Sequence, residues 1–143
     1  MRLKGIDPLL SPALLETLAA MGHGDVLAVV DRNFPGASTT QRLIEMPGIS
    51  VDAALAAIMT LFPVDDTFET PAAWRMGAVG EEQTVLPVHA AVQEVLNAAE
   101  DREVEVAPLE RFEFYRRARE AFAVVQTTEE RPYGCFLIAK GVV

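Results

Sequence analysis

The sequence predicts an α/β fold in three layers, a single domain over residues 1–143 with helices packed on both faces of a central β-sheet. Stretches typical of strands alternate along the chain with stretches typical of amphipathic helices. The strand-like stretch Val26–Val30 is continuously apolar, as in a strand that is buried on both faces, and Phe136–Ala139 is a second, short apolar strand. With 143 residues, of which 50% are hydrophobic, the chain has the length of about one domain and enough apolar side chains for one core.

The first helix is expected over residues 12–21, with Ser11 as its N-cap and a proline at its first position. Gly22 is expected to end this helix in the left-handed conformation, because glycine adopts positive φ without steric cost. The apolar strand Val26–Val30 follows and places Asp31 at its carboxyl end. His23, which stands between two glycines, therefore lies shortly before this strand.

Residues 33–36 have the composition of a turn, and a weaker strand is expected at 42–45. Ser50 is expected to cap a second helix that ends at the Phe62-Pro63 step. Its apolar face consists of Val51, Leu55, Ile58, Met59 and Phe62. The remaining expected elements are a strand at 73–79, a polar turn at 80–83, a third helix marked by Val88, Val92, Val95 and Leu96 and ending near Asp101, a half-exposed strand around Val104 and Val106, a fourth helix from Phe112 to Phe122, a strand at 123–125, and a turn at 131–134 before the last strand.

The composition excludes several classes of partner and place. A net charge of −9, a pI near 4.6 and only two lysines exclude DNA and RNA as main partners, because their phosphates would be repelled. No apolar stretch is long enough to cross a bilayer, so no membrane association is expected. The absence of a signal-peptide pattern and the single cysteine favour a cytoplasmic location. The apolar surplus is better explained by interfaces in a homo-oligomer.

His23 and Asp31 are the first candidates for chemistry. The two glycines that flank His23 let its backbone approach a ligand closely, although a turn histidine bonded to nearby carbonyls is an equal alternative. Asp31, at a strand end, could orient the imidazole or share a proton with it. Alternatively, Asp31 is an Asx-turn residue at the point where the chain leaves the strand.

The second group of candidates lies towards the end of the chain. Arg111 precedes an aromatic cluster at a helix start, where its guanidinium could bind ligand hydroxyls, with a solvated surface arginine as the alternative. Tyr133 stands in a turn before the last strand and could present its ring and phenol to a small polar molecule. Cys135 has no basic neighbour and no metal-spaced partner, so it is expected to be a small buried side chain. His89 is expected to have a surface or packing role, and Asp65-Asp66 to form a solvated turn.

Motifs for nucleotides and for serine-hydrolase chemistry are missing from the sequence. It contains no GxGxxG, no GxxxxGK[ST] and no GxSxG. No metal site is supported either. We therefore expect neither a cofactor nor a metal.

Several segments, distributed in collinear order over nearly the whole chain, belong to one pattern: Leu3-Lys4-Gly5-Ile6, Leu9-Leu10-Ser11-Pro12, Met21-Gly22-His23-Gly24-Asp25, Asn33-Phe34-Pro35, Phe112-Glu113-Phe114-Tyr115, Ala121-Phe122-Ala123-Val124-Val125, Tyr133-Gly134 and Lys140-Gly141-Val142. On these segments the chain resembles the fucose mutarotase/ribose pyranase family, and it is closer to the fucose mutarotase branch. The residue after Tyr-Gly is usually Asn in that family, whereas this chain has Cys135. Arg32 and Gly36 also depart from the family pattern.

The resemblance implies an enzyme without metal or cofactor that interconverts the anomers of a free sugar, most readily L-fucose, and that forms a homodecamer in bacteria. On matching positions it implies that His23 is the general acid. The sugar contacts would come from Asp31, Arg111 and the segment Tyr133, Gly134 and Cys135.

Mutarotation needs one proton to leave the anomeric hydroxyl and another to reach the ring oxygen. Histidine suits this exchange because it takes up and releases protons near neutral pH. We expect His23 to exchange the proton at the ring oxygen, with Asp31 orienting the imidazole or binding a hydroxyl. An apolar wall from Phe34, Trp74 or Phe112 would recognise the methyl group of a deoxysugar.

Three alternatives to L-fucose mutarotation follow from the sequence. A ribose pyranase-type activity on D-ribose would use the same residues. A non-catalytic sugar-binding oligomer would need Asp31, Arg111 and Tyr133 but no titrating His23. A receiver-like phosphorelay domain is not favoured, because it would need a helix after Lys140 and only three residues follow Lys140 in this sequence.

Overall fold

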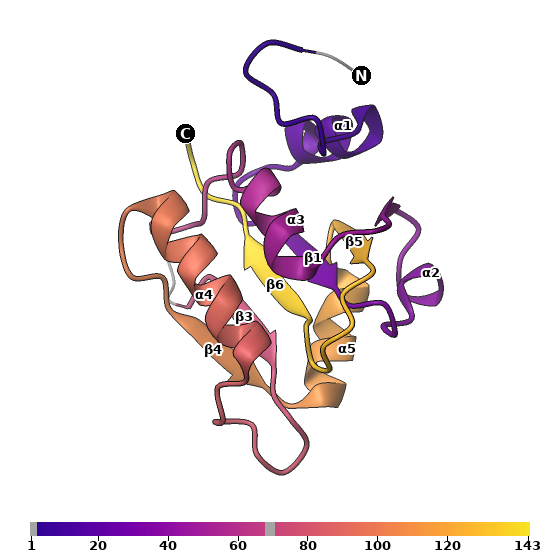
Figure 1. Cartoon of the computed structure of the whole chain (residues 1–143), viewed down its shortest axis with the longest axis vertical. Coiled ribbons are helices and arrows are strands. Elements are labelled where there is room, and N and C mark those ends of the chain that lie inside the picture. Colours follow the sequence, from indigo (N-terminus) through magenta and orange to yellow (C-terminus); the bar gives the residue numbers. More distant parts are fainter. Residues whose placement is uncertain (1–2, 68–70) are drawn as a thin grey trace.

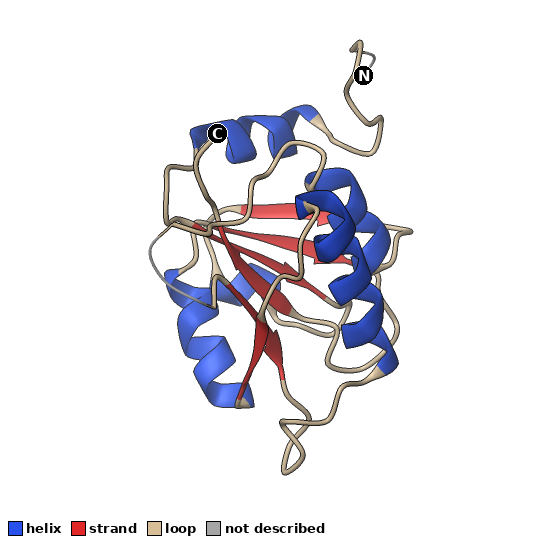
Figure 2. Cartoon of the chain, turned by 90° about the vertical axis from the view of Figure 1, so that its left-hand side faces the viewer, coloured by secondary structure: helices blue, strands red, loops and turns tan. Residues whose placement is uncertain are grey.

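The computed structural model describes residues 3–67 and 71–143, and within these ranges the chain forms five helices and one six-stranded sheet (Figure 1). The helices are α1 (Pro12–Ala20), α2 (Gly36–Thr39), α3 (Val51–Ile58), α4 (Pro87–Glu100) and α5 (Arg111–Glu120). The strands are β1 (Val26–Val30), β2 (Leu43–Met46), β3 (Ala73–Met76), β4 (Val106–Leu109), β5 (Ala123–Thr127) and β6 (Phe136–Ala139). Figure 2 shows helices on both faces of the sheet, which confirms the predicted three-layer α/β fold.

The strand order β2-β5-β1-β6-β3-β4 determines which loops meet. β1 pairs with β5, β5 with β2, and β3 with β4 in parallel, whereas β6 runs antiparallel to both of its neighbours, β1 and β3. Five strands therefore share one direction and β6 opposes them. As a result, the carboxyl ends of β1 to β5 and the amino end of β6 lie along the same edge of the sheet. Ligand sites of open α/β sheets commonly form at the carboxyl edge.

Side-chain alternation along the central strands divides the interior into two cores. In β1, Leu27 and Val29 face the helices α1, α3 and α4, while Ala28 and Val30 face α5. The larger core also contains Phe62 and Leu96, and the smaller one contains Phe114 of α5. Every side chain from Leu27 to Val30 is fully buried, as the continuous apolar run predicts.

Two helix starts follow the predicted caps. Ser11 Oγ accepts a hydrogen bond from the Leu14 N–H, and Ser50 Oγ accepts one from the Ala53 N–H. α4 ends at Glu100 as predicted, with Asp101 in the left-handed conformation at φ 52°. No helix in the described ranges is long and apolar enough to cross a membrane.

The end of the first helix differs from the prediction. α1 ends at Ala20, Met21 is extended, and Gly22 is not left-handed. The carbonyls at this end are satisfied by the Lys140 ammonium, which donates to Leu18 O at 2.8 Å and to Met21 O at 2.6 Å. Because a distant lysine caps the helix, no glycine is needed there.

Other element boundaries also differ from the prediction. The short helix α2 replaces part of the turn expected at 33–36. Regular α3 ends at Ile58, although backbone bonds from Leu61 N–H and Phe62 N–H to Ile58 O continue the turn towards Phe62. β3 ends at Met76, three residues before the predicted end at position 79.

Candidate functional site

A small cavity of about 240 Å³ opens at the carboxyl edge of the sheet. Its lining comes from the loop after β1, the end of β3, the start of α5 after β4, and the loop before β6. These residues are Asp31, Asn33, Phe34, Met76, Arg111, Tyr115, Pro132, Tyr133 and Cys135. The mixed topology explains why positions more than 100 residues apart in sequence, such as Asp31 and Cys135, meet here. The volume lies below the range of about 300–1,000 Å³ for drug-sized ligands and suits a smaller molecule.

Asp31 is buried at the end of β1 and shapes the turn that follows it. Its Oδ1 accepts hydrogen bonds from Asn33 N–H at 3.0 Å and from Phe34 N–H at 3.1 Å. The Asx-turn alternative is therefore confirmed as its local role. Asp31 nevertheless lines the cavity, so the turn also fixes the position of a hydrogen-bond acceptor at the cavity wall.

Arg111, the first residue of α5, also lines the cavity. Its guanidinium stacks over Phe112 at 4.8 Å and over Tyr115 at 5.7 Å. Its Nε is buried and has no hydrogen-bond partner among residues 3–67 and 71–143. A buried donor without an acceptor is rare in proteins, and a ligand oxygen would satisfy it. Arg111 as a whole is half-buried, and its Nε is shielded from water in a way that a fully solvated surface arginine would not be.

Tyr133 has a left-handed backbone with φ 61°, which is uncommon for a side chain larger than asparagine. Its hydroxyl accepts a hydrogen bond from Val79 N–H at 3.4 Å. Gly134 is not among the cavity-lining residues. A Cβ at Gly134 would lie 3.0 Å from Glu129 Cγ and 3.3 Å from Arg131 O, so glycine allows the loop to pack closely behind Tyr133.

Cys135 lines the cavity and is 1% exposed, as predicted for a buried side chain. Burial, followed by the negative charge of Asp31, raises the pKa of the Cys135 thiol well above its ordinary value. The thiol therefore stays protonated at neutral pH. This agrees with the prediction that Cys135 is no thiolate nucleophile.

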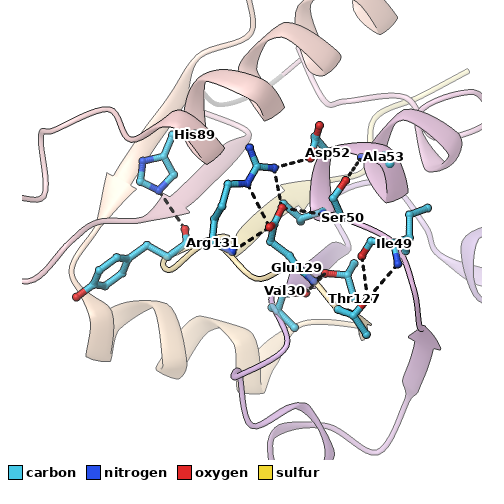
Figure 3. Close-up of polar contacts among 12 residues, drawn as sticks. Val30, Ile49, Ser50, Asp52, Ala53, His89, Thr127, Glu129 and Arg131 are labelled. Atoms are coloured by element: carbon cyan, nitrogen blue, oxygen red, sulfur yellow. Dashed lines mark hydrogen bonds and ion pairs between the residues drawn. The ribbon is translucent and has the colours of Figure 1, made fainter.

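An ion-pair network anchors the loop that carries Tyr133 (Figure 3). Arg131 binds Glu129 Oε1 at 2.7 Å and Asp52 Oδ1 of α3 at 2.7 Å, and Glu129 Oε1 also accepts from Val51 N–H at 3.3 Å. Burial alone would raise the pKa of Glu129, but the hydrogen bonds from Arg131 and Val51 lower it to about 2. The network ties the loop to the N-terminus of α3.

His23 lies at the other edge of the sheet. It precedes β1, whereas Asp31 follows β1, and five strand residues at about 3.3 Å each separate the two by roughly 16 Å. Asp31 therefore does not orient the imidazole of its own chain. His23 lies instead in an open hollow with α1, Leu61 and residues 140–143.

Asp65, and not Asp31, is the carboxylate that contacts the His23 imidazole. His23 Nε2 lies 3.0 Å from Asp65 Oδ1 and 3.0 Å from Thr67 Oγ1, and the Thr67 hydroxyl donates to Asp65 Oδ1 at 2.7 Å. The hydrogen bond from the Thr67 hydroxyl is the largest of the effects that lower the pKa of Asp65. The prediction of a solvated turn at Asp65-Asp66 is wrong for Asp65, which is 8% exposed. A contact across 42 residues has no local signal in the sequence.

His89 is also more constrained than predicted. It is 3% exposed and stacks edge-on against Phe136. A surface role is therefore wrong and a packing role is confirmed. In the described part of the chain, no group of three or more His, Cys, Asp or Glu side chains is arranged to hold a metal ion.

The chain is similar to known proteins over nearly its whole length. Residues 4–143 match the model of the RbsD / FucU transport protein family. An L-fucose mutarotase of Haemophilus influenzae (strain 86-028NP) is 41% identical over 140 residues, which cover 98% of this chain and 96% of that protein. A fucose mutarotase of Homo sapiens is 40% identical over 146 residues, covering 99% of this chain and 94% of that protein. The crystal structure of the fucose mutarotase from Streptococcus pneumoniae in complex with L-fucose superposes with a TM-score of 0.87 at 31% identity, covering 99% of both chains.

Proposed function

The chain belongs to the RbsD / FucU family, and we propose that it is a mutarotase that interconverts the α and β anomers of L-fucose. The observation that carries this proposal is full-length identity of about 40% to L-fucose mutarotases, combined with a small cavity in which Asp31, Arg111 and Tyr133 meet. A carboxylate, a guanidinium and a phenol in one cavity supply acceptors and donors for a polyhydroxylated ring.

Each lining residue has a part in holding the sugar. Asp31 accepts hydrogen bonds from a hydroxyl, and Arg111 donates to ring hydroxyls, with its unpaired Nε among the available donors. Tyr133 and the buried Cys135 complete the polar part of the cavity lining. Phe34 and Met76 line the cavity and provide an apolar wall for the methyl group of a deoxysugar. Trp74 and Phe112, the other candidates for this wall, do not line it.

The reaction moves two protons and breaks one bond. His23 gives a proton to the ring oxygen as the bond between that oxygen and C1 breaks, and Asp31 takes the proton of the anomeric hydroxyl as the C1 carbonyl forms. The open aldehyde turns about its C1–C2 bond. The reverse transfers then close the ring on the other face and restore both side chains.

His23 reaches the cavity from a neighbouring subunit of a homo-oligomer, and we propose a decamer. The separation of His23 and Asp31 by the length of β1 supports this arrangement, because one chain cannot bring the two together. Exposed apolar side chains near both places, Phe112 and Val142, are suited to a subunit interface. The free buried Cys135 is consistent with action in the reducing cytoplasm.

NMR exchange spectroscopy tests the activity directly. We expect faster exchange between the anomeric signals of L-fucose than in a buffer blank, with smaller acceleration for D-galactose and D-ribose. A larger acceleration for D-ribose would replace L-fucose as the substrate. Sugar binding without any acceleration would support the non-catalytic alternative.

Mixing two inactive variants tests the shared site. His23→Ala and Asp31→Asn subunits, refolded together in equal amounts, should restore about a quarter of wild-type activity, because one pairing in four combines an intact His23 with an intact Asp31 from the next subunit. Each variant refolded alone should remain inactive. No recovery on mixing would place both residues of one site in the same chain.

A further inference from the structure

The left-handed backbone of Tyr133 needs support from outside its own turn, because a tyrosine does not favour positive φ by itself. The Tyr133 carbonyl meets His89 Nε2 at 3.0 Å, and the Tyr133 hydroxyl meets Val79 N–H at 3.4 Å. Figure 3 shows the His89 ring pointing from α4 towards this carbonyl. The Tyr133 carbonyl is thus held by α4, through His89, and the Tyr133 hydroxyl by the loop between β3 and α4, through Val79.

The surroundings of His89 determine which ring nitrogen carries hydrogen. The Leu86 N–H, at the start of α4, donates to Nδ1 at 3.1 Å, and Arg75 Nη1 lies 3.4 Å from the same atom. The Leu86 N–H that points at Nδ1 requires this atom to be an acceptor, and the positive guanidinium beside it disfavours a proton there. In the neutral ring, Nε2 then carries the hydrogen and donates to Tyr133 O.

Arg75 organises the loop on the other side of Tyr133. It is 6% exposed on β3, and its Nη1 donates to Glu82 O at 3.1 Å and to Thr84 O at 3.2 Å. This loop carries Val79, whose N–H binds the Tyr133 hydroxyl. Arg75 therefore supports both contacts of Tyr133, one through His89 and one through the loop.

We propose that Arg75 and His89 form a buried positioning pair that holds Tyr133 in its left-handed conformation at the sugar cavity. The His89 side chain contacts the backbone carbonyl of Tyr133 and does not line the cavity. His89 is therefore a positioning residue and takes no part in the proton transfers. This inference rests on the proposed function where it concerns the sugar, and on the contacts alone where it concerns the conformation of Tyr133.

Two variants separate the two nitrogens of His89. In His89→Gln the side-chain amide reaches the place of Nε2 and can still donate to Tyr133 O, whereas in His89→Asn it reaches only the place of Nδ1 and can still accept from Leu86 N–H. We expect His89→Asn to raise KM for L-fucose about five- to tenfold, the effect of about one hydrogen bond, and to leave kcat nearly unchanged. His89→Gln should stay within about twofold of wild type in KM, whatever it loses in thermal stability. Equal KM values for the two variants would overturn the proposal.

Two spectroscopic measurements keep the test independent of activity. The chain has two tyrosines, so protein labelled with 3-fluorotyrosine gives two ¹⁹F signals, which Tyr133→Phe assigns. The Tyr133 signal should shift or broaden in His89→Asn and not in His89→Gln, even if the wild-type protein accelerates no sugar exchange. In the wild-type protein, ¹⁵N NMR of the imidazole should find Nε2 protonated and Nδ1 bare. A proton on Nδ1 would overturn the proposal even if neither variant folds.

Discussion

The two ends of β1 carry the candidate chemistry in different ways. At the carboxyl end, Asp31 shares a cavity with Arg111 and Tyr133, and hydrogen bonds to the Asp31 carboxylate and to the Tyr133 carbonyl support these residues. At the amino end, His23 lies in an open hollow, where Asp65 and Thr67 hold one edge of its ring. In the proposed mechanism the first end binds the sugar and, through Asp31, accepts one proton, whereas the second end presents the proton donor.

This difference teaches that sugar binding and proton transfer can be changed separately. Substitutions of Arg111 and of the residues that support the cavity should alter KM or the stability of the cavity, and substitutions of His23 and its partners should alter kcat. Asp31, which is proposed both to contact the sugar and to take a proton, should affect kcat as well. Four predictions test this division, and each has an outcome that would break it.

The largest effect is expected from His23→Ala. A positioned acid or base contributes about 10²–10⁴-fold, so kcat for anomer exchange should fall by about that factor. Binding of L-fucose, measured by NMR titration, should stay within a few fold of wild type. A comparable loss of binding would mean that His23 also holds the sugar, and the two ends would then not be separable.

Arg111→Ala should show the opposite pattern. A hydrogen bond to a charged group contributes about 1.5–3 kcal/mol, so KM should rise by about 10- to 100-fold, with a much smaller change in kcat. Arg119→Ala is the matched control, because Arg119 is an exposed arginine on the same helix and lines no part of the cavity. If kcat falls while KM stays unchanged, Arg111 acts in the chemistry and the division is wrong.

The layers of this fold could be predicted from the sequence because they follow from local patterns. The continuous apolar run of β1 and the caps at Ser11 and Ser50 each act within a few residues. The strand order could not be predicted in this way, because no local sequence pattern shows that β6 enters the sheet antiparallel between β1 and β3. Without this order, the loops that share an edge remain unknown.

The same limit applies to the site. The sequence motifs indicate His23, Asp31, Arg111 and Tyr133 as single residues, and the structure brings three of them together and places His23 at the other edge. Asp65 has no motif, and its interaction with His23 depends on a contact over 42 residues. Proximity in the sequence suggested a pairing of His23 with Asp31 that the intervening strand prevents.

Glu129 provides a pH test of the support behind the cavity. Folding lowers its pKa from 4.5 to about 2, so the folded protein binds a proton less readily than the unfolded chain. Its stabilising contribution, on the order of 1–3 kcal/mol, is complete above about pH 5 and is lost as the pH falls towards 2. Urea unfolding at pH 7 and pH 3 should show that Glu129→Gln flattens this dependence.

Glu113 is the control for this measurement. Hydrogen bonds from Arg116 and Arg117 lower its pKa to about 2 as well, but the group lies on the exposed face of α5. Water and salt screen such surface pairs, so Glu113→Gln should leave the pH dependence nearly unchanged. An equal effect of both substitutions would mean that Glu129 is no more important to the cavity than a surface pair.

The smallest effect is expected from Asp65→Asn, which keeps the shape and an acceptor beside His23 but removes the charge. A charged hydrogen bond is about twice as strong as a neutral one, so kcat should fall about three- to tenfold with little change in KM. Asp66→Asn is the matched control, because Asp66 is the exposed neighbour of the buried Asp65. Steady-state exchange rates at several L-fucose concentrations separate kcat from KM.

A rise in KM alone would assign Asp65 to sugar binding, and the hollow at the amino end of β1 would then bind sugar together with the cavity. A loss as large as that of His23→Ala would instead make the carboxylate itself the group that exchanges the proton, with His23 orienting it.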